Sequence, residues 1–93
     1  MKPIEWNLEK NKWLMRVRGI SFEEVAEKIA LTDATVVEHH NKQKYPHQKM
    51  YILEIRGYVY QVPFVEDDKK VFLKTIIPNR KYTKQYYKRK EAP

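Results

Sequence analysis

Three cationic side chains in the second half of the chain could together bind a phosphodiester. Arg56, Lys74 and Arg80 each lie in or just after a stretch in which apolar and polar residues alternate. Alternation of period two predicts strands whose polar residues share one face of a sheet. Guanidinium and ammonium groups gathered on one face suit phosphate oxygens. The alternative is a solvated face on which Glu54 pairs with Arg56 or with Lys74.

The composition favours a polyanionic partner. The 93 residues contain 19 Lys and Arg against 12 Asp and Glu, which gives a formal net charge of +7. Such an excess on a small domain is typical of nucleic-acid-binding proteins, and a soluble basic protein with counterions is the other interpretation. The chain has no cysteine, which excludes disulfides and thiolate metal sites.

No targeting or membrane segment is expected. Charged residues occur at once after Met1, where a signal peptide would need an apolar stretch. No apolar run approaches the roughly 18 residues of a membrane-spanning helix. We therefore expect a single domain over residues 1–93, located in the cytoplasm, whose last residues from about 88 form a disordered tail.

Two helices are expected in the N-terminal third. Asn7 can cap a first helix, and Gly19 is suited to a left-handed C-terminal cap. Ser21 and Glu24 have the spacing of a capping box. An apolar stripe at helical spacing follows them, which predicts a second helix over about residues 22–31.

Strands are expected on both sides of these helices. Ile4 and Trp6 flank a glutamate, which predicts a short first strand. Further strands are predicted at about residues 34–40, 50–56, 58–66 and 71–77. Short connections imply antiparallel pairing. We therefore expect an α+β domain in which two helices pack on one face of an antiparallel sheet of three to four further strands, followed by a basic C-terminal segment.

The face of the sheet away from the helices would carry the cations. In the predicted register its side chains are Ile52, Glu54, Arg56, Gln61, Phe72, Lys74 and Ile76. Arg80 and Lys81 would follow at its edge. Apolar side chains among these charges suggest that a partner covers part of the face. Pro63 cannot donate to a strand ladder and predicts a bulge or an edge position.

Both ends of the chain resemble BrnT-family toxins. The opening resembles that family's Trp-containing strand, its helix rich in Lys and Asn, and its Arg-Gly-Ile-Ser-Phe-Glu-Glu link, and it reads IEWNLEKNKWLMRVRGISFEEVAEKI. The ending resembles the family's final strand and basic segment, and it reads FLKTIIPNRKYTKQY. The matching residues of this ending are Lys74, Asn79, Arg80, Lys81, Thr83, Lys84 and Tyr86.

The resemblance implies a small ribonuclease of a type II toxin–antitoxin system within the RelE-like group. The implied partners are a cognate antitoxin and an RNA substrate, in a dimer of toxin–antitoxin heterodimers, and no cofactor is implied. Family members use basic residues of the sheet and the C-terminal segment on RNA, which points to Arg56, Lys74, Arg80 and Lys81. Residues 38–49, which read EHHNKQKYPHQK, depart from the acidic connection of better-known members.

A metal-independent ribonuclease needs a base, positive donors for the phosphorane and an acid for the leaving oxygen. Arg56 and Arg80 are expected to stabilise the negative charge. Lys74 could do the same or exchange a proton. Glu54 and His39 are candidate bases.

Three histidines compete for the proton-transfer role. His39 and His40 are adjacent, so on a strand they would face opposite ways and only one could reach the site. His47 lies beside Pro46 in a polar connection. Their spacing fits no helical or knuckle metal site, so no metal site is expected.

The basic C-terminal segment is expected to contact RNA. Its candidate RNA-binding residues are Lys81, Thr83, Lys84, Tyr86 and Lys88. The lysines would attract phosphates in a salt-sensitive way. Tyr86 could stack on an unpaired base or, together with Tyr82 on one helix face, pack against the sheet. A non-catalytic nucleic-acid-binding protein or a protein-interaction module is the alternative function.

Overall fold

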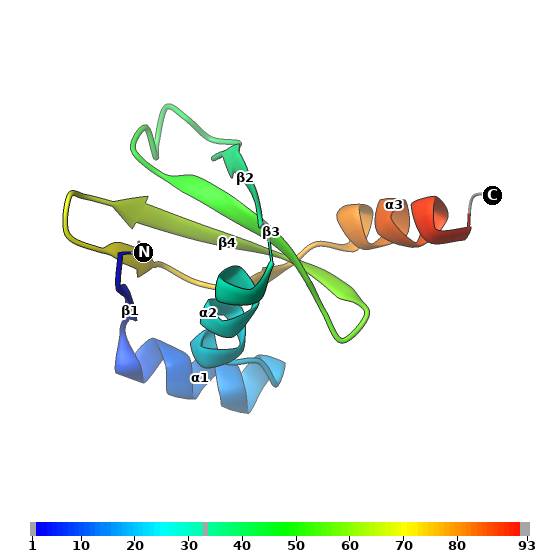
Figure 1. Ribbon diagram of the computed structural model, residues 1–93, viewed down its shortest axis with the longest axis horizontal. Helices are drawn as coiled ribbons and strands as arrows, with labels where there is room; N and C mark the ends of the chain where they lie inside the picture. Colours follow the sequence, from blue (N-terminus) through cyan, green and yellow to red (C-terminus); the bar gives the residue numbers. More distant parts are fainter. Residues whose placement is uncertain (1, 33, 92–93) are drawn as a thin grey trace.

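The computed structural model describes residues 2–32 and 34–91. Within these ranges one strand precedes two helices, and the remaining strands and a third helix follow them, which is an α+β order (Figure 1). The elements are β1 (Ile4–Trp6), α1 (Leu8–Arg18), α2 (Phe22–Leu31), β2 (Thr35–Glu38), β3 (Lys49–Ile55), β4 (Tyr58–Glu66), β5 (Val71–Leu73), β6 (Ile77–Pro78) and α3 (Arg80–Glu91). The α+β class predicted from the sequence is confirmed.

Local capping signals set the ends of the first two helices. Oδ1 of Asn7 accepts the backbone N–H of Lys10 at 2.9 Å, and Gly19 ends α1 with a φ of 67°. Ser21 and Glu24 form the predicted capping box, because each side chain accepts the backbone N–H of the other residue. The predicted caps are therefore confirmed.

Asn11 joins the two helices from a buried position. Its Oδ1 accepts the backbone N–H of Phe22 at 2.7 Å, and its Nδ2 donates to Glu23 at 2.6 Å. The first backbone N–H groups of a helix have no hydrogen-bond partner within that helix. In α2, the side chain of Asn11 from α1 supplies a partner for one of these groups, the N–H of Phe22. At the other end of α1, Arg18 donates to the carbonyl of Ile76.

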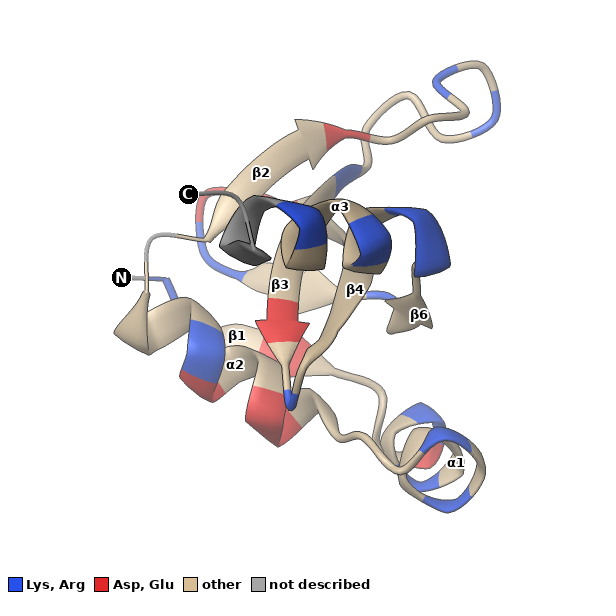
Figure 2. Cartoon of the chain, turned by 90° about the vertical axis from the view of Figure 1, so that its right-hand side faces the viewer, with Lys and Arg blue, Asp and Glu red and all other residues tan. Residues whose placement is uncertain are grey.

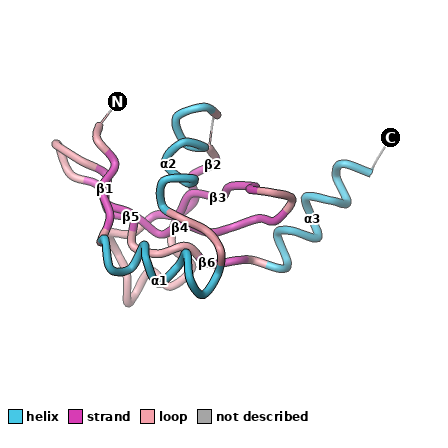
Figure 3. The backbone as a smooth tube through the Cα atoms, turned by 90° about the horizontal axis from the view of Figure 1, so that it is seen from below, coloured by secondary structure: helices cyan, strands magenta, loops and turns pink. Residues whose placement is uncertain are grey.

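The strands form one mixed sheet in the order β1-β5-β4-β3-β2, and β6 pairs with β4 beyond the end of β5. The pairs β2–β3, β3–β4, β4–β5 and β4–β6 are antiparallel, as expected from their short connections. The N-terminal strand β1 joins the edge parallel to β5. Helix α3 extends from the end of the molecule opposite to β1 (Figures 1 and 3).

A bulge separates β5 from β6. Phe64 pairs with Leu73, and Gln61 pairs with Ile77. The segment of β4 from Phe64 to Gln61 spans three residue steps, whereas the facing segment from Leu73 to Ile77 spans four. The facing segment therefore contains one extra residue, which defines a β-bulge. The interruption lies opposite Pro63, which has no N–H to donate. The bulge predicted at this proline is confirmed, and the continuous strand predicted over 71–77 is wrong.

The bulge changes which residues face the helices. After one extra residue the alternation of side chains is inverted, so Ile76 points into the core with 0% exposure. Its predicted position on the opposite face is wrong for this reason. Lys74, at the bulge, donates its backbone N–H to the carbonyl of Pro63 at 2.8 Å.

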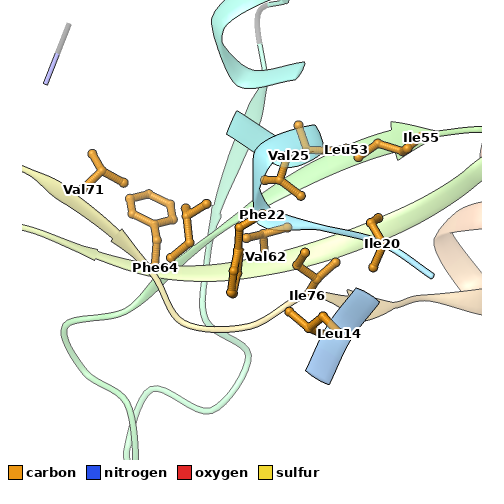
Figure 4. Close-up of a cluster of buried hydrophobic side chains, with 11 residues drawn as sticks. Leu14, Ile20, Phe22, Val25, Leu53, Ile55, Val62, Phe64, Val71 and Ile76 are labelled. Carbon is orange, nitrogen blue, oxygen red and sulfur yellow. The ribbon is translucent and has the colours of Figure 1, made fainter. Parts of the chain in front are cut away.

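The core lies between the sheet and helices α1 and α2, which cover the same face (Figures 1 and 4). Its buried members are Leu14, Ile20, Phe22, Val25, Leu53, Ile55, Val62, Phe64, Val71, Leu73 and Ile76. The ring of Trp6 from β1 stacks on Phe22, with centroids 5.8 Å apart. The prediction of two helices on one face is confirmed.

Helix α3 extends to Glu91. Residues 88–91, which were predicted to belong to a disordered tail, are therefore helical. The end of that predicted tail, residues 92–93, lies outside the described residues. Among residues 2–32 and 34–91, no helix combines the length and apolar character needed to cross a lipid bilayer.

Candidate functional site

Arg56 does not join Lys74 on one face. It occupies the β3–β4 turn with a φ of 52°, and Gly57 follows with a φ of 82°. Its guanidinium pairs with Glu24 and donates to the carbonyl of Gly19 at 2.8 Å. The strand alternation used for the prediction ends before this turn, and the chain reverses there. The side chain therefore reaches the helix side of the sheet, and its predicted place beside Lys74 is wrong.

Glu54 and Arg80 also lie apart from Lys74. Glu54 forms an ion pair with Lys28 of α2 at 3.9 Å. Arg80 is the exposed first residue of α3. Neither lines the pocket that contains Lys74. Of the five candidate catalytic residues, Glu54 and Arg56 line a separate pocket beside α2. The structure brings Lys74 together with His39 in another pocket.

These two residues share an open pocket of about 440 Å³, here called the histidine pocket. It is lined by Lys10, His39, His40, Tyr45, Gln48, Pro63, Lys74, Thr75 and Ile77. Helix α1, the β2–β3 loop, strand β4 and the segment after β5 all contribute to it. Sequence reasoning missed Lys10 and Tyr45. The HHNKQKY stretch carried a signal for Tyr45, because a ring close to two histidines in a loop can stack on them.

His39 is buried, with 7% exposure. Its ring stacks on His40 with centroids 4.5 Å apart and lies 4.6 Å from Tyr45. Its Nδ1 accepts the backbone N–H of Asn41 at 3.0 Å, and the backbone N–H of His39 donates to the carbonyl of Gln48. The prediction that the adjacent histidines face opposite ways is wrong, because β2 ends one residue earlier and the chain turns.

Burial lowers the pKa of His39 below its usual 6.5, and the charge of His40 lowers this pKa further. His39 therefore has a lower pKa in the folded state than in the unfolded state. At pH values between these two pKa values, the unfolded state binds more protons than the folded state. The free energy of unfolding is therefore expected to fall as the pH decreases through about 6.5, and this contribution is complete at higher pH. Urea denaturation at several pH values measures the change.

The matched variants for this measurement are His39→Phe and His47→Phe. The first removes the buried titrating ring and is expected to flatten the pH dependence, whereas the second changes an exposed histidine and is expected to retain it. His40, Tyr45, Lys10 and Lys74 also line this pocket and are unchanged in both variants. An equal pH dependence in both variants would contradict the assignment.

The two lysines of the histidine pocket are free to meet an anion. Nζ of Lys74 lies 5.6 Å from the ring centroid of Phe72, and Nζ of Lys10 lies 4.6 Å from that of Trp13. Within residues 2–32 and 34–88, neither ammonium group has a carboxylate at ion-pair distance. Aromatic faces hold these cations weakly and leave them partly hydrated.

The side chain of Thr83 is buried and forms structural hydrogen bonds, so it is not accessible to RNA. It is 7% exposed, and its hydroxyl accepts the backbone N–H of Val59 at 2.9 Å and donates to the carbonyl of Asn79 at 2.8 Å. The hydroxyl of Tyr87 likewise donates to the carbonyl of Gly57 at 2.6 Å. These bonds fasten α3 to the β4 edge and to the β3–β4 turn.

The face predicted to be open is partly covered by α3. Half-buried Tyr82 and Tyr86 line a groove of about 350 Å³ against the sheet. The other residues of this groove are Thr35, Val37, Ile52, Leu53, Glu54, Val59 and Gln85. Packing against the sheet therefore accounts for the spacing of the two tyrosines.

Within residues 80–88, where the structure describes the side chains of α3, the exposed cations are Arg80, Lys81, Lys84 and Lys88. Figure 2 shows them in blue along a helix that lies apart from the acidic residues of α2. Those acidic residues are Glu23, Glu24 and Glu27. Helix α3 thus presents a row of exposed cations, and the sequence predicted RNA contacts for three of them, Lys81, Lys84 and Lys88.

The histidine pocket and the exposed cations of α3 are the two features that bear on function. Comparisons of the chain with protein-family models, with curated proteins and with solved structures find no match. The observations on function therefore consist of the chemistry of these two surfaces and the resemblance of both ends of the chain to BrnT-family toxins.

Proposed function

We propose that this protein is a BrnT-like ribonuclease toxin of a type II toxin–antitoxin system. It cleaves RNA without a metal ion in the cytoplasm, and a cognate antitoxin inhibits it. The observation that carries the proposal is the histidine pocket, in which Lys74 and His39 meet Lys10, His40 and Tyr45. Cations and imidazoles are the two kinds of group that metal-independent phosphodiester cleavage requires.

The charge of this pocket supports a polyanionic substrate. Its lining contains two lysines and two histidines and no carboxylate. A second pocket, between α2 and the end of β3, contains Glu24, Glu27 and Glu54 together with Lys28 and Arg56, so its formal charge is about −1. A phosphate group would therefore be attracted more strongly to the histidine pocket than to this one. The net charge of +7 acts in the same direction over longer distances.

The second candidate function is nucleic-acid binding without cleavage. The observation that favours it is the position of the α3 cations, which do not line the histidine pocket. A protein that only bound RNA would need those cations and no proton-transfer groups. The two functions therefore differ in whether RNA fragments accumulate after binding.

Induced expression in a bacterial host tests the proposal. We expect the wild-type chain to arrest growth and fragment RNA. Lys74→Ala is expected to reduce RNA fragmentation by about 10²-fold or more, because one preorganised charge at a developing oxyanion contributes on that order. Lys69→Ala is the matched control, since Lys69 is an exposed lysine in the β4–β5 turn outside the pocket lining.

Normal growth and intact RNA with the wild-type chain would contradict the proposed function. Growth arrest that is equally strong with Lys74→Ala would place the activity elsewhere on the molecule. The antitoxin part of the proposal has its own readout, because coexpression of the neighbouring gene is expected to restore growth.

A further inference from the structure

We propose that the histidine pocket binds the reacting phosphodiester, with His40 as the proton-exchanging residue and His39 as its positioning residue. This inference rests on the proposed function and assigns roles within the same pocket. It changes the expectation from the sequence, in which His39 was a candidate base and His40 was its competitor.

The charged side chains that line the pocket are both cationic, and they come from two different elements. Helix α1 supplies Lys10, and the segment after β5 supplies Lys74. The β2–β3 loop supplies the imidazoles and Tyr45, whereas β4 supplies the uncharged Pro63. Two ammonium groups from elements distant in sequence can therefore reach one bound phosphate.

The carboxylate next to the pocket in sequence is neutralised. Glu38 directly precedes the two histidines and forms an ion pair with Lys42 at 2.9 Å. Neither residue of this pair lines the histidine pocket. The anion would therefore meet no opposing charge from the described residues of the lining.

His39 cannot readily serve as the base. Its Nδ1 already accepts the N–H of Asn41, so in the neutral ring the proton is on Nε2. The ring is buried, and burial disfavours the protonated form that a base must reach. What His39 does provide is a fixed, flat surface, because its ring accepts the backbone N–H of Asn41 and stacks on His40.

His40 has the properties that His39 lacks. It is exposed, and within the described residues its ring has no hydrogen-bond partner from the protein. Both ring nitrogens are therefore open to a substrate. Stacking on a buried ring restricts the side chain to a narrow range of positions, which reduces the entropy lost when a substrate is aligned.

The reaction balances with these groups. A ring nitrogen of His40 takes the proton of the ribose 2′-hydroxyl, and the 2′ oxygen forms a bond to phosphorus. The bond from phosphorus to the 5′ oxygen breaks, and that oxygen takes a proton from water. The resulting hydroxide then removes the proton from His40. The products are a 2′,3′-cyclic phosphate and a 5′-hydroxyl, and no oxidant or reductant takes part.

Binding of inorganic phosphate tests the site without relying on activity. In a titration followed by histidine NMR signals, we expect the signals of His39 and His40 to move and that of His47 to stay. Lys74→Ala and Lys10→Ala are each expected to weaken phosphate binding about 10-fold, and Lys69→Ala to leave it unchanged. Equal affinity of wild type and Lys74→Ala would overturn the anion site.

Cleavage of RNA in a translating cell extract tests the roles. His40→Ala is expected to lower kcat by about 10²-fold or more, with little change in KM or in phosphate affinity. His47→Ala, which changes an exposed histidine outside the pocket, is the matched control and should cleave like wild type. Unaltered cleavage by His40→Ala would overturn its role while the proposed function stands.

The positioning role of His39 has a readout that loss of structure would not produce. His39→Phe keeps a flat ring under His40 and is expected to retain kcat within a few fold. His39→Ala removes the stacking surface and is expected to lower kcat and leave phosphate affinity unchanged. Loss of kcat in both variants, with His40 intact, would overturn the positioning role.

Absence of any cleavage by the wild-type chain in this extract would overturn both the proposed function and the proton-transfer role. Phosphate binding that depends on Lys74 would still support the anion site in that case. The cleavage assay therefore tests the proposed function and the role of His40, whereas the phosphate titration tests the anion site independently.

Discussion

Replacement of the four exposed cations of α3 by glutamine is expected to weaken binding of single-stranded RNA by roughly 100-fold or more at about 0.1 M salt. The residues are Arg80, Lys81, Lys84 and Lys88. Each cation that contacts a phosphate releases a counterion and adds about 0.7 to the slope of log affinity against log salt. The slope is therefore expected to fall by about 3. Fluorescence anisotropy at several salt concentrations measures both quantities.

The matched control changes cations that lie away from α3. Lys12 and Arg16 are exposed on α1, and Lys42 and Lys69 lie in loops. Replacing these four by glutamine changes the net charge by the same amount. If α3 forms the RNA-binding surface, the control loses much less affinity and slope. Equal losses in the two quadruple variants would indicate attraction by net charge alone.

Phe22→Ala is expected to lower the free energy of unfolding by about 3–5 kcal/mol. Phe22 has 0% exposure and stacks on Trp6, so its removal leaves a cavity at the junction of α2 with β1. A domain of this length has a total stability of only about 5–14 kcal/mol. Urea denaturation followed by tryptophan fluorescence measures the loss.

Leu8→Ala is the control for this variant. Leu8 is also a large apolar residue near the N-terminus, but it is 71% exposed. Its replacement is expected to change the free energy of unfolding by no more than about 0.5 kcal/mol. A loss in Phe22→Ala as small as the loss expected for Leu8→Ala would mean that the packing of α2 on β1 contributes little to stability.

The structure separates the two tasks that the sequence analysis assigned to one surface. The exposed cations proposed to bind RNA lie on α3, whereas the groups suited to proton transfer lie in the histidine pocket. The arginine expected at the centre of the site, Arg56, instead ties the β3–β4 turn to α2 through Glu24 and Gly19. Its contribution is therefore to the fold, through an ion pair that is more than half exposed on the arginine side.

The partial covering of the sheet has a consequence for the protein-interaction alternative. That alternative relied on exposed Ile52, Phe72 and Ile76. Ile76 is fully buried in the core, and Ile52 lines the groove beneath α3. An apolar partner surface built from these three side chains together is therefore excluded by the position of Ile76.

Local chemistry in the sequence was sufficient to determine the first two helices and the order of the strands from β1 to β4 along the chain. The caps at Asn7, Gly19 and Ser21 act over three or four residues, so their geometry depends on near neighbours only. The period-two alternation determined which residues of β3 face the helices, because each strand buries one face. The bounds of β4 and α2 also follow from these signals.

Only the tertiary structure decided which functional groups meet. One inserted residue opposite Pro63 inverted the alternation beyond Leu73, and a tight turn at Arg56 carried that side chain to the helix side. The histidine pocket depends on contacts between α1, a loop and the bulged segment, which are far apart in the chain. Periodicity describes positions within one element, whereas a site of this kind depends on where separate elements come to rest against one another.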